Sequence, residues 1–206
     1  MFVIAAALCL GFRSCSVNQQ SITFETDYPY YGMETKQEGL NAMSWRPDDL
    51  TELEDFAPII LKGVLSDDAQ HRTIQSVEPR TLTVSTFTIT DVYKGELKKG
   101  DVIEVSEFYH VETEGGKQIL YQMDGYMPIA PGLEFVVFLE KYPILPMDGW
   151  ENTYTPCCHQ LGRYIVPSAN TVSADNIDSM TIQELYLSEE SSLYRELFEE
   201  VAQKYM

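Results

Sequence analysis

Reactive side chains are scarce in this chain. Its 206 residues include three histidines and four cysteines, and lysine and arginine number 14 against 32 aspartates and glutamates. The sequence also lacks G-x-S-x-G, H-E-x-x-H, a phosphate-binding glycine loop and a G-x-G-x-x-G between a strand and a helix. Hydrolytic and metal-dependent mechanisms therefore have few side chains available, and we expect no cofactor.

The shortage of basic residues gives a formal net charge of -18 at pH 7. Such a surface repels nucleic-acid phosphate, and the sequence has no Lys/Arg cluster that could neutralise a phosphate backbone. We therefore expect no DNA or RNA partner, and the acidity is typical of a soluble exterior. With 44% hydrophobic residues, the chain is long enough for one domain with a substantial core.

Long hydrophobic runs are also missing, except at the N-terminus. Phe2 to Phe12 is an apolar run of eleven residues, too short for a membrane-spanning helix of about 20 residues but typical of a signal peptide. Cys15 follows Phe12, Arg13 and Ser14, which resembles a bacterial lipoprotein processing box despite the unusual Arg13. We expect Cys15 to carry lipid and to anchor the protein on the extracellular face of the cytoplasmic membrane. Two alternatives are cleavage by ordinary signal peptidase, which would release a secreted protein, and a buried N-terminal strand.

Residues 16–47 show little periodicity and are predicted to form a tether and a lead-in to the domain. Their aromatic side chains could stack on a sugar or a partner protein, or cover an edge of the domain. These residues are Tyr28, Tyr30, Tyr31 and Trp45.

A short helix is predicted from Asp48 to Ala57. Leu50, Leu53 and Phe56 are spaced along one face, and Asp48 or Asp49 can serve as the N-cap. The acidic residues opposite lack the oxygen spacing and the glycine of an EF-hand loop, so they are interpreted as solvated carboxylates and no calcium is expected. They are Asp49, Glu52 and Asp55.

Short β-branched and aromatic runs separated by turn residues follow, and they predict a small β-barrel or sandwich. Gly115-Gly116 between two of these runs predicts a tight hairpin. The apolar phase changes after Val84 and again at Val92, which predicts β-bulges that help a small barrel to coil. The predicted strands are Ile59 to Leu65, Leu82 to Tyr93, Val102 to Glu107, Phe108 to Thr113, Lys117 to Gln122, Leu133 to Leu139 and Arg163 to Val166.

The C-terminal segment is predicted to be helical. Thr181 and Glu184 form a possible capping box for a short helix. A longer helix from about Ser191 places Leu193, Leu197 and Val201 on one stripe, which indicates core contact, with a partner-docking face as the alternative.

Four short motifs resemble a domain found in uncharacterised secreted proteins and lipoproteins of Gram-positive bacteria. They are Val92-Tyr93-Lys94-Gly95, Gly100-Asp101-Val102-Ile103, Pro131-Gly132 leading into Phe135 to Leu139, and Gly162-Arg163-Tyr164. Their order is in turn similar to the OB-like barrel of netrin and tissue-inhibitor-of-metalloproteinase modules, over about Ile59 to Val166. The resemblance implies an OB-like fold. The inhibitor family uses a disulfide-tied N-terminal cysteine against a catalytic metal, whereas Cys15 has no evident disulfide partner.

One cluster could carry chemistry, namely Cys157-Cys158-His159. In an extended segment Cys157 and His159 would project to the same face, where they could act as nucleophile and base, or hold a metal together with His110. Adjacent cysteines do not fit ordinary disulfide geometry. We therefore expect two buried thiols or a strained vicinal disulfide, with a structural role.

The sequence thus predicts a mainly β, OB-like barrel with a short helix before it and a helical C-terminus. Its parts are residues 1–15 (signal or lipoprotein segment), 16–47 (tether and lead-in), 48–170 (β domain) and 171–206 (helical segment packed on the domain). We expect an exported, membrane-tethered binding module without a catalytic site, whose partner is an extracellular protein or an envelope component. Two alternatives are an inhibitor of an extracellular protease and a thiol-dependent enzyme using Cys157 and His159.

Overall fold

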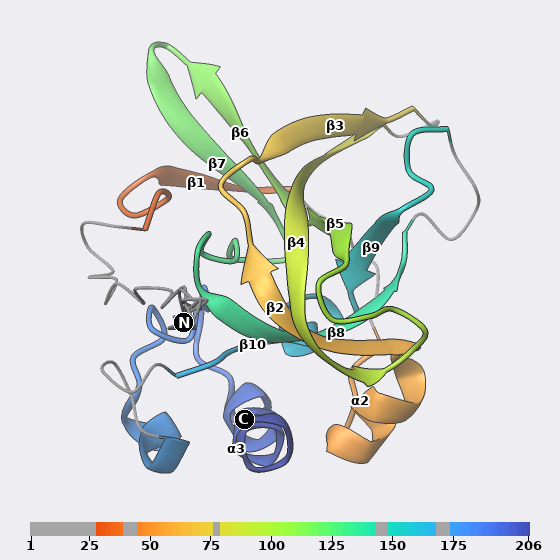
Figure 1. Ribbon diagram of the computed structural model, residues 1–206. Helices are drawn as coiled ribbons and strands as arrows, with labels where there is room; N and C mark the ends of the chain where they lie inside the picture. The colour runs from red at the N-terminus through yellow and green to blue at the C-terminus, as the bar shows by residue number, and fades with distance from the viewer. Residues whose placement is uncertain (1–27, 39–44, 76–78, 143–147, 168–173) are drawn as a thin grey trace, which may run out of the picture.

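Five strands close into a β-barrel in the computed structural model, which describes residues 28–38, 45–75, 79–142, 148–167 and 174–206 (Figure 1). The strands pair in the order β2–β4–β5–β9–β8, and β8 returns to β2. The β5–β9 pair is parallel and the other neighbours are antiparallel. A closed barrel has no free edge of its own. The predicted mainly β, OB-like barrel with flanking helices is confirmed.

The elements have the following bounds. The strands are Glu34–Glu38 (β1), Ile59–Leu65 (β2), Gln70–Ile74 (β3), Arg80–Lys94 (β4), Val102–Glu107 (β5), Tyr109–Glu114 (β6), Lys117–Met123 (β7), Glu134–Lys141 (β8), Thr153–Pro156 (β9) and Arg163–Ile165 (β10). The α-helices are Leu50–Phe56 (α2) and Ser192–Tyr205 (α3), and the 3-10 helices are His159–Gly162 (η1) and Ala174–Ser179 (η2). None of the helices in the described part of the chain is long and apolar enough to cross a membrane.

Strand β4 serves two hydrophobic clusters, which explains its first change of apolar phase. Leu82 and Val84 pack in a cluster with residues of the β6–β7 hairpin, whereas Phe87 and Ile89 pack in the barrel cluster. The register of β4 against β5 is continuous across this change, so the bulge predicted after Val84 was wrong. Register shifts do occur further along, against β2, where Val92 had indicated a second change.

A second sheet, ordered β1–β7–β6, projects from the barrel (Figure 1). We call these three strands the hairpin sheet. Gly115 and Gly116 have φ angles of 56° and 82°, as a type I′ turn requires, and the predicted hairpin is confirmed. Strand β1 pairs in parallel with β7, and Tyr28 ahead of it is buried. Residues 28–38 are therefore part of the folded unit, although their polar sequence had suggested a lead-in without structure.

Helix α2 begins at Leu50, two residues after the predicted start. The predicted N-cap is confirmed at Asp49, whose side chain accepts a hydrogen bond from the Glu52 backbone N–H at 2.9 Å. Leu53 is fully buried, whereas Phe56 is 45% exposed and stacks on Trp45. A spacing of three residues falls short of a full turn, so Phe56 lies about 120° around the helix from the first leucine. The prediction that Phe56 shares the buried face was wrong.

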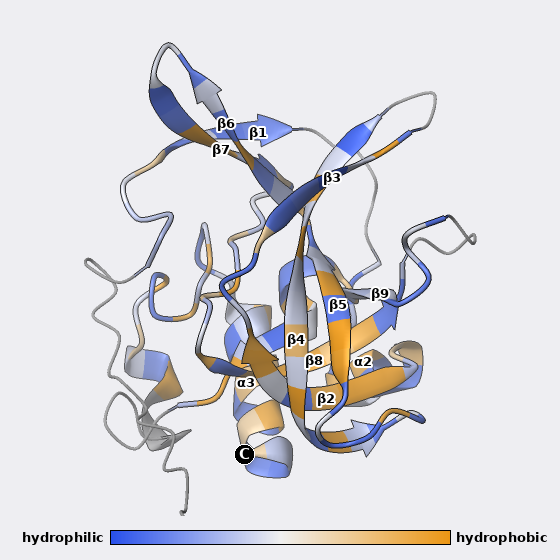
Figure 2. Ribbon diagram, turned by 45° about the horizontal axis from the view of Figure 1, so that its top comes forward, coloured by the Kyte–Doolittle hydropathy of each residue, from blue (hydrophilic) through white to orange (hydrophobic). Residues whose placement is uncertain are grey.

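The C-terminal helix α3 covers the outer face of β2 and β8. Leu197 and Val201 pack against Ile60, Val136 and Phe138, which confirms the predicted core stripe. Figure 2 shows the hydrophobic colouring of β2, β5 and β8, and the hydrophilic tip of the β6–β7 hairpin.

The predicted capping box before α3 is also present. The Thr181 N–H donates to Glu184 Oε2 at 2.7 Å, and the Glu184 N–H donates to Thr181 Oγ1 at 3.3 Å. The chain then makes a single turn that ends at Tyr186, whose φ is 56°, so this segment forms a turn and the predicted short helix was wrong.

Candidate functional site

The predicted cysteine cluster interrupts the strand that closes the barrel. Strands β9 and β10 both pair with β8, and residues 157–162 form an excursion between them. Cys158 and His159 have φ angles of 54° and 56°, so the segment is not extended and the interpretation that placed Cys157 and His159 on one face was wrong. Gly162 closes the excursion, because a Cβ there would lie 2.2 Å from the Cys157 carbonyl oxygen.

Neither thiol is prepared for nucleophilic attack. Both cysteines are free. Burial, reinforced by the Glu140 carboxylate, raises the pKa of Cys157 far above its usual value and that of Cys158 to about 12. Burial also lowers the pKa of His159. The His159 and Phe108 rings are in contact, with their centroids 4.4 Å apart. A reactive cysteine needs a depressed pKa, so this arrangement holds the thiols in their neutral form.

His110 lies in a different group, on β6. Its ring stacks on Tyr121 with centroids 4.9 Å apart, and its Nε2 lies 3.3 Å from Glu112 Oε1. Within the described ranges, no three His, Cys, Asp or Glu side chains are arranged to hold a metal ion. Cys15, the predicted lipid site, lies outside the described residues.

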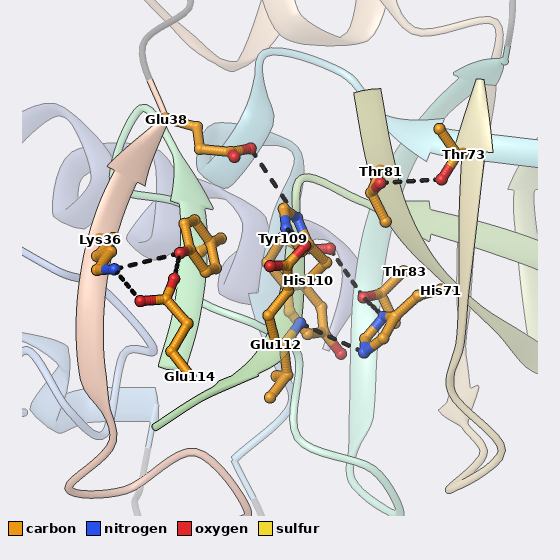
Figure 3. Close-up of polar contacts among 12 residues, drawn as sticks. Lys36, Glu38, His71, Thr73, Thr81, Thr83, Tyr109, His110, Glu112 and Glu114 are labelled. Atoms are coloured by element: carbon orange, nitrogen blue, oxygen red, sulfur yellow. Dashed lines mark hydrogen bonds and ion pairs between the residues drawn. The ribbon is translucent and has the colours of Figure 1, made fainter. Parts of the chain in front are cut away.

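The structure brings His110 close to a histidine that sequence reasoning did not single out (Figure 3). His71 on β3 accepts a hydrogen bond from the Val111 N–H at its Nε2, 3.3 Å away. Its Nδ1 lies 2.9 Å from Thr83 Oγ1, which donates to the Tyr109 carbonyl at 2.8 Å. Because the Thr83 proton is used in that bond, Nδ1 must carry the histidine proton. We call this set of bonds the His71 clasp.

The clasp therefore requires a neutral imidazole. It joins β3 and β4 to the edge of β6, whose Val111 N–H would otherwise be unpaired. Partial burial and the neighbouring His110 ring lower the pKa of His71, while Glu112 opposes them. A proton added at Nε2 would face the Val111 N–H and break the bond.

Polar side chains of β1, β6 and β7 contact one another across the hairpin sheet (Figure 3). Lys36 of β1 forms an ion pair with Glu114 of β6 at 2.6 Å. Tyr121 of β7, between them, donates to Glu114. Glu38 lies 3.9 Å from His110. These contacts tie all three strands together, so the projecting sheet is cross-braced by side chains as well as by its backbone.

Two charged residues are fully buried, Glu107 at the end of β5 and Arg163 at the start of β10. Glu107 Oε1 accepts hydrogen bonds from the Ile129 N–H at 2.7 Å and the Tyr126 hydroxyl at 3.1 Å. Burial raises the pKa of Glu107 to about 7. The sequence did contain a signal for this residue, because Glu107 follows Ile103 and Val105 at a spacing of two and so shares their inward phase.

An open cavity of about 490 Å³ lies at the barrel rim. It is lined by Pro29 of the lead-in, the end of β2 with the following turn, Thr88, Pro131 and Gly132. The residues that line it are both polar and apolar, and they include the acidic Asp67. The rim therefore offers a concave, weakly acidic surface beside the lead-in.

No protein-family model matches this chain, and no curated protein matches it.

Proposed function

We propose that this protein is an exported, membrane-tethered interaction module that binds an extracellular protein or another envelope component through the hairpin sheet. The observation that carries the proposal is the position of that sheet. It stands outside a closed barrel (Figure 1), and the residues around its turn, including Thr113 and Gln118, are exposed. A rigid projecting surface costs little conformational entropy on binding.

The bracing of the sheet supports a binding role. A two-stranded hairpin alone is marginally stable in water. Here β1 adds a third strand, Lys36 and Glu114 link its two outer strands, and the His71 clasp fixes the base of β6. The contacts hold a polar surface in place away from the hydrophobic core.

Two matched variants test the binding surface. Thr113→Lys with Gln118→Lys adds two positive charges on paired residues of the hairpin and should abolish capture of the partner from native envelope extracts. Glu199→Gln with Glu200→Gln makes the same change in net charge on exposed positions of α3 and should leave capture unchanged. Equal capture by the two variants would show that the partner binds elsewhere and would contradict the assignment of the binding surface to the hairpin sheet.

The proposed tether is tested at Cys15. A diacylated cysteine supplies the two hydrophobic chains that stable anchoring requires. The full-length protein should enter the detergent phase on phase partitioning, and Cys15→Ala should shift it to the aqueous phase. Aqueous partitioning of both proteins would contradict lipid attachment.

A second candidate function is inhibition of an extracellular protease. A protein that blocks a protease cleft needs a rigid, exposed segment near the barrel, and the β6–β7 hairpin meets that requirement. Inhibition assays against a panel of extracellular proteases separate the two functions. Inhibition that the Thr113→Lys, Gln118→Lys variant loses would favour this second candidate.

A further inference from the structure

Arg163 is fully buried, yet only part of its guanidinium is used. Nη2 donates to the carbonyls of Met127 at 2.5 Å and Tyr186 at 2.8 Å. The guanidinium lies over the Tyr126 ring, 4.7 Å from its centroid. Among the described residues, Nε and Nη1 have no hydrogen-bond partner. Buried donors of a charged group are costly to leave unpaired.

Glu107, in turn, has a buried acceptor atom without a hydrogen-bond partner among the described residues. Its Oε1 is bonded to Ile129 and Tyr126, whereas its buried Oε2 has no partner within the described part of the chain. A carboxylate has acceptor capacity at both oxygens. One acceptor and two donors are therefore left over on two fully buried residues of opposite charge.

Glu107 and Arg163 lie on either side of the same tyrosine. Tyr126 donates its hydroxyl to Glu107, and its ring contacts Arg163. The backbone partners are also close in sequence, since Ile129 binds Glu107 and Met127 binds Arg163. The two charges are thus neighbours around Tyr126, but the described residues include no direct ion pair between them.

We propose that Glu107 and Arg163 form a buried binding site for one small neutral molecule with both a donor and an acceptor, which in the free protein is water. The guest accepts from Arg163 Nη1 or Nε and donates to Glu107 Oε2. A buried water makes about three hydrogen bonds to otherwise unpaired polar groups, and this site offers that number.

The charges at the site select against other guests. The Glu107 carboxylate repels an anion, and the Arg163 guanidinium repels a cation. An apolar guest would leave all three polar atoms unpaired. A molecule that donates on one side and accepts on the other satisfies both residues.

The open cavity suggests how such a guest enters. Pro29 lines that cavity, and its neighbour Tyr28 donates its hydroxyl to the Pro128 carbonyl at 2.9 Å. The Glu107 and Arg163 charges both act on the Tyr28 hydroxyl. Tyr28 therefore adjoins a residue of the cavity lining in sequence and lies near the buried pair, so its ring is the side chain that we expect to control entry.

A crystal structure of the protein at about pH 8, above the pKa of about 7 of Glu107, tests the site. We expect one ordered solvent peak within about 3.2 Å of Glu107 Oε2 and of Arg163 Nη1 or Nε. A direct ion pair with no solvent between the two side chains would overturn the proposal, as would the absence of any peak at the pair.

Solution measurements use the same protein with labelled arginine. The Arg163 Nε–H should show a nuclear Overhauser effect to a long-lived water, and Glu107→Gln, which keeps an acceptor, should retain it. Arg72→Met is the matched control, since Arg72 is already paired with Glu104 at 2.6 Å, and it should leave the signal intact. Absence of the effect in both the unmodified protein and Glu107→Gln would refute the site. The buried site does not depend on the proposed function, so unchanged partner capture by the hairpin-sheet variants would not contradict it.

Discussion

At the scale of single residues, the most consequential group is an acid that continues the inward phase of strand β5. Glu107 is fully buried, and its pKa is raised to about 7 by that burial. The folded protein therefore holds a proton on this carboxyl that the unfolded chain, with a glutamate pKa near 4.3, releases. Folding and protonation are coupled between these two values.

Replacing Glu107 by Gln should remove this coupling. Because the folded-state pKa is raised, the stabilising effect of protonation is fully present below about pH 4.3 and is lost as pH rises through about 7. Relative to Glu107→Gln, the unmodified protein should lose stability between these values, by roughly 4 kcal/mol at most for a shift of this size. Urea unfolding across the pH range measures the difference. Parallel stability curves for the two proteins would contradict the assignment.

At the scale of elements, the His71 clasp makes the attachment of the hairpin sheet sensitive to acid. The folded state lowers the pKa of His71, so the fold favours the neutral ring. Stability from this group is present above the unfolded-state pKa of about 6.5 and decreases as pH falls below it.

Acidification should therefore release the Val111 amide. Loss of one hydrogen bond worth about 1 kcal/mol corresponds to a roughly fivefold drop in protection. Amide hydrogen exchange at pH 7.5 and pH 5, corrected for intrinsic rates, should show this drop at Val111 but not at Leu120 in the centre of β7. In His71→Ala the Val111 amide should be weakly protected at both pH values. A pH-dependent drop that persists in that variant would assign the effect to another group.

The elements also show what the sequence could and could not predict. Strands with strong apolar runs, such as Ile59–Leu65 and Val102–Glu107, have the predicted bounds. Strands β1 and β3 were missed because they are polar and their pairing depends on distant partners, which local pattern does not report. Strand β9 was missed because it spans four residues and ends in Pro156.

The candidate site followed the same rule. The sequence indicated Cys157, Cys158 and His159 because their side chains are of reactive types. Their roles depend on positive φ angles and on burial, which a single sequence does not report. His71 and Arg163 acquire their roles from contacts across strands that lie far apart in the chain. For His71, the partner Val111 is 40 residues away.

At the scale of the whole molecule, residues 28–38 of the lead-in are part of the fold. Tyr28 is 4% exposed, and β1 forms one edge of the hairpin sheet. A chain that begins at Asp48 therefore loses a buried aromatic residue and a strand.

We expect a chain beginning at Asp48 to be less stable than one beginning at Ser16. Burial of one large aromatic side chain alone contributes about 2 kcal/mol, and the loss of β1 adds to that. Urea unfolding of both chains measures the difference, and Tyr28→Ala in the longer chain should reproduce part of it. Equal midpoints for the two chains would mean that the lead-in packs too weakly to contribute.

The pairing order of the barrel also has a consequence for when the protein can fold. Strand β9 must pair with both β5 and β8 before the barrel closes. A chain that is synthesised from its N-terminus therefore cannot close the barrel until Pro156, the last residue of β9, has also emerged. The Tyr28 hydroxyl bonds to Pro128, a hundred residues later. Distant pairings of this kind slow folding. The bond between Tyr28 and Pro128 can therefore form only after a hundred further residues have emerged, and during that interval the acidic charge of the chain opposes association between molecules.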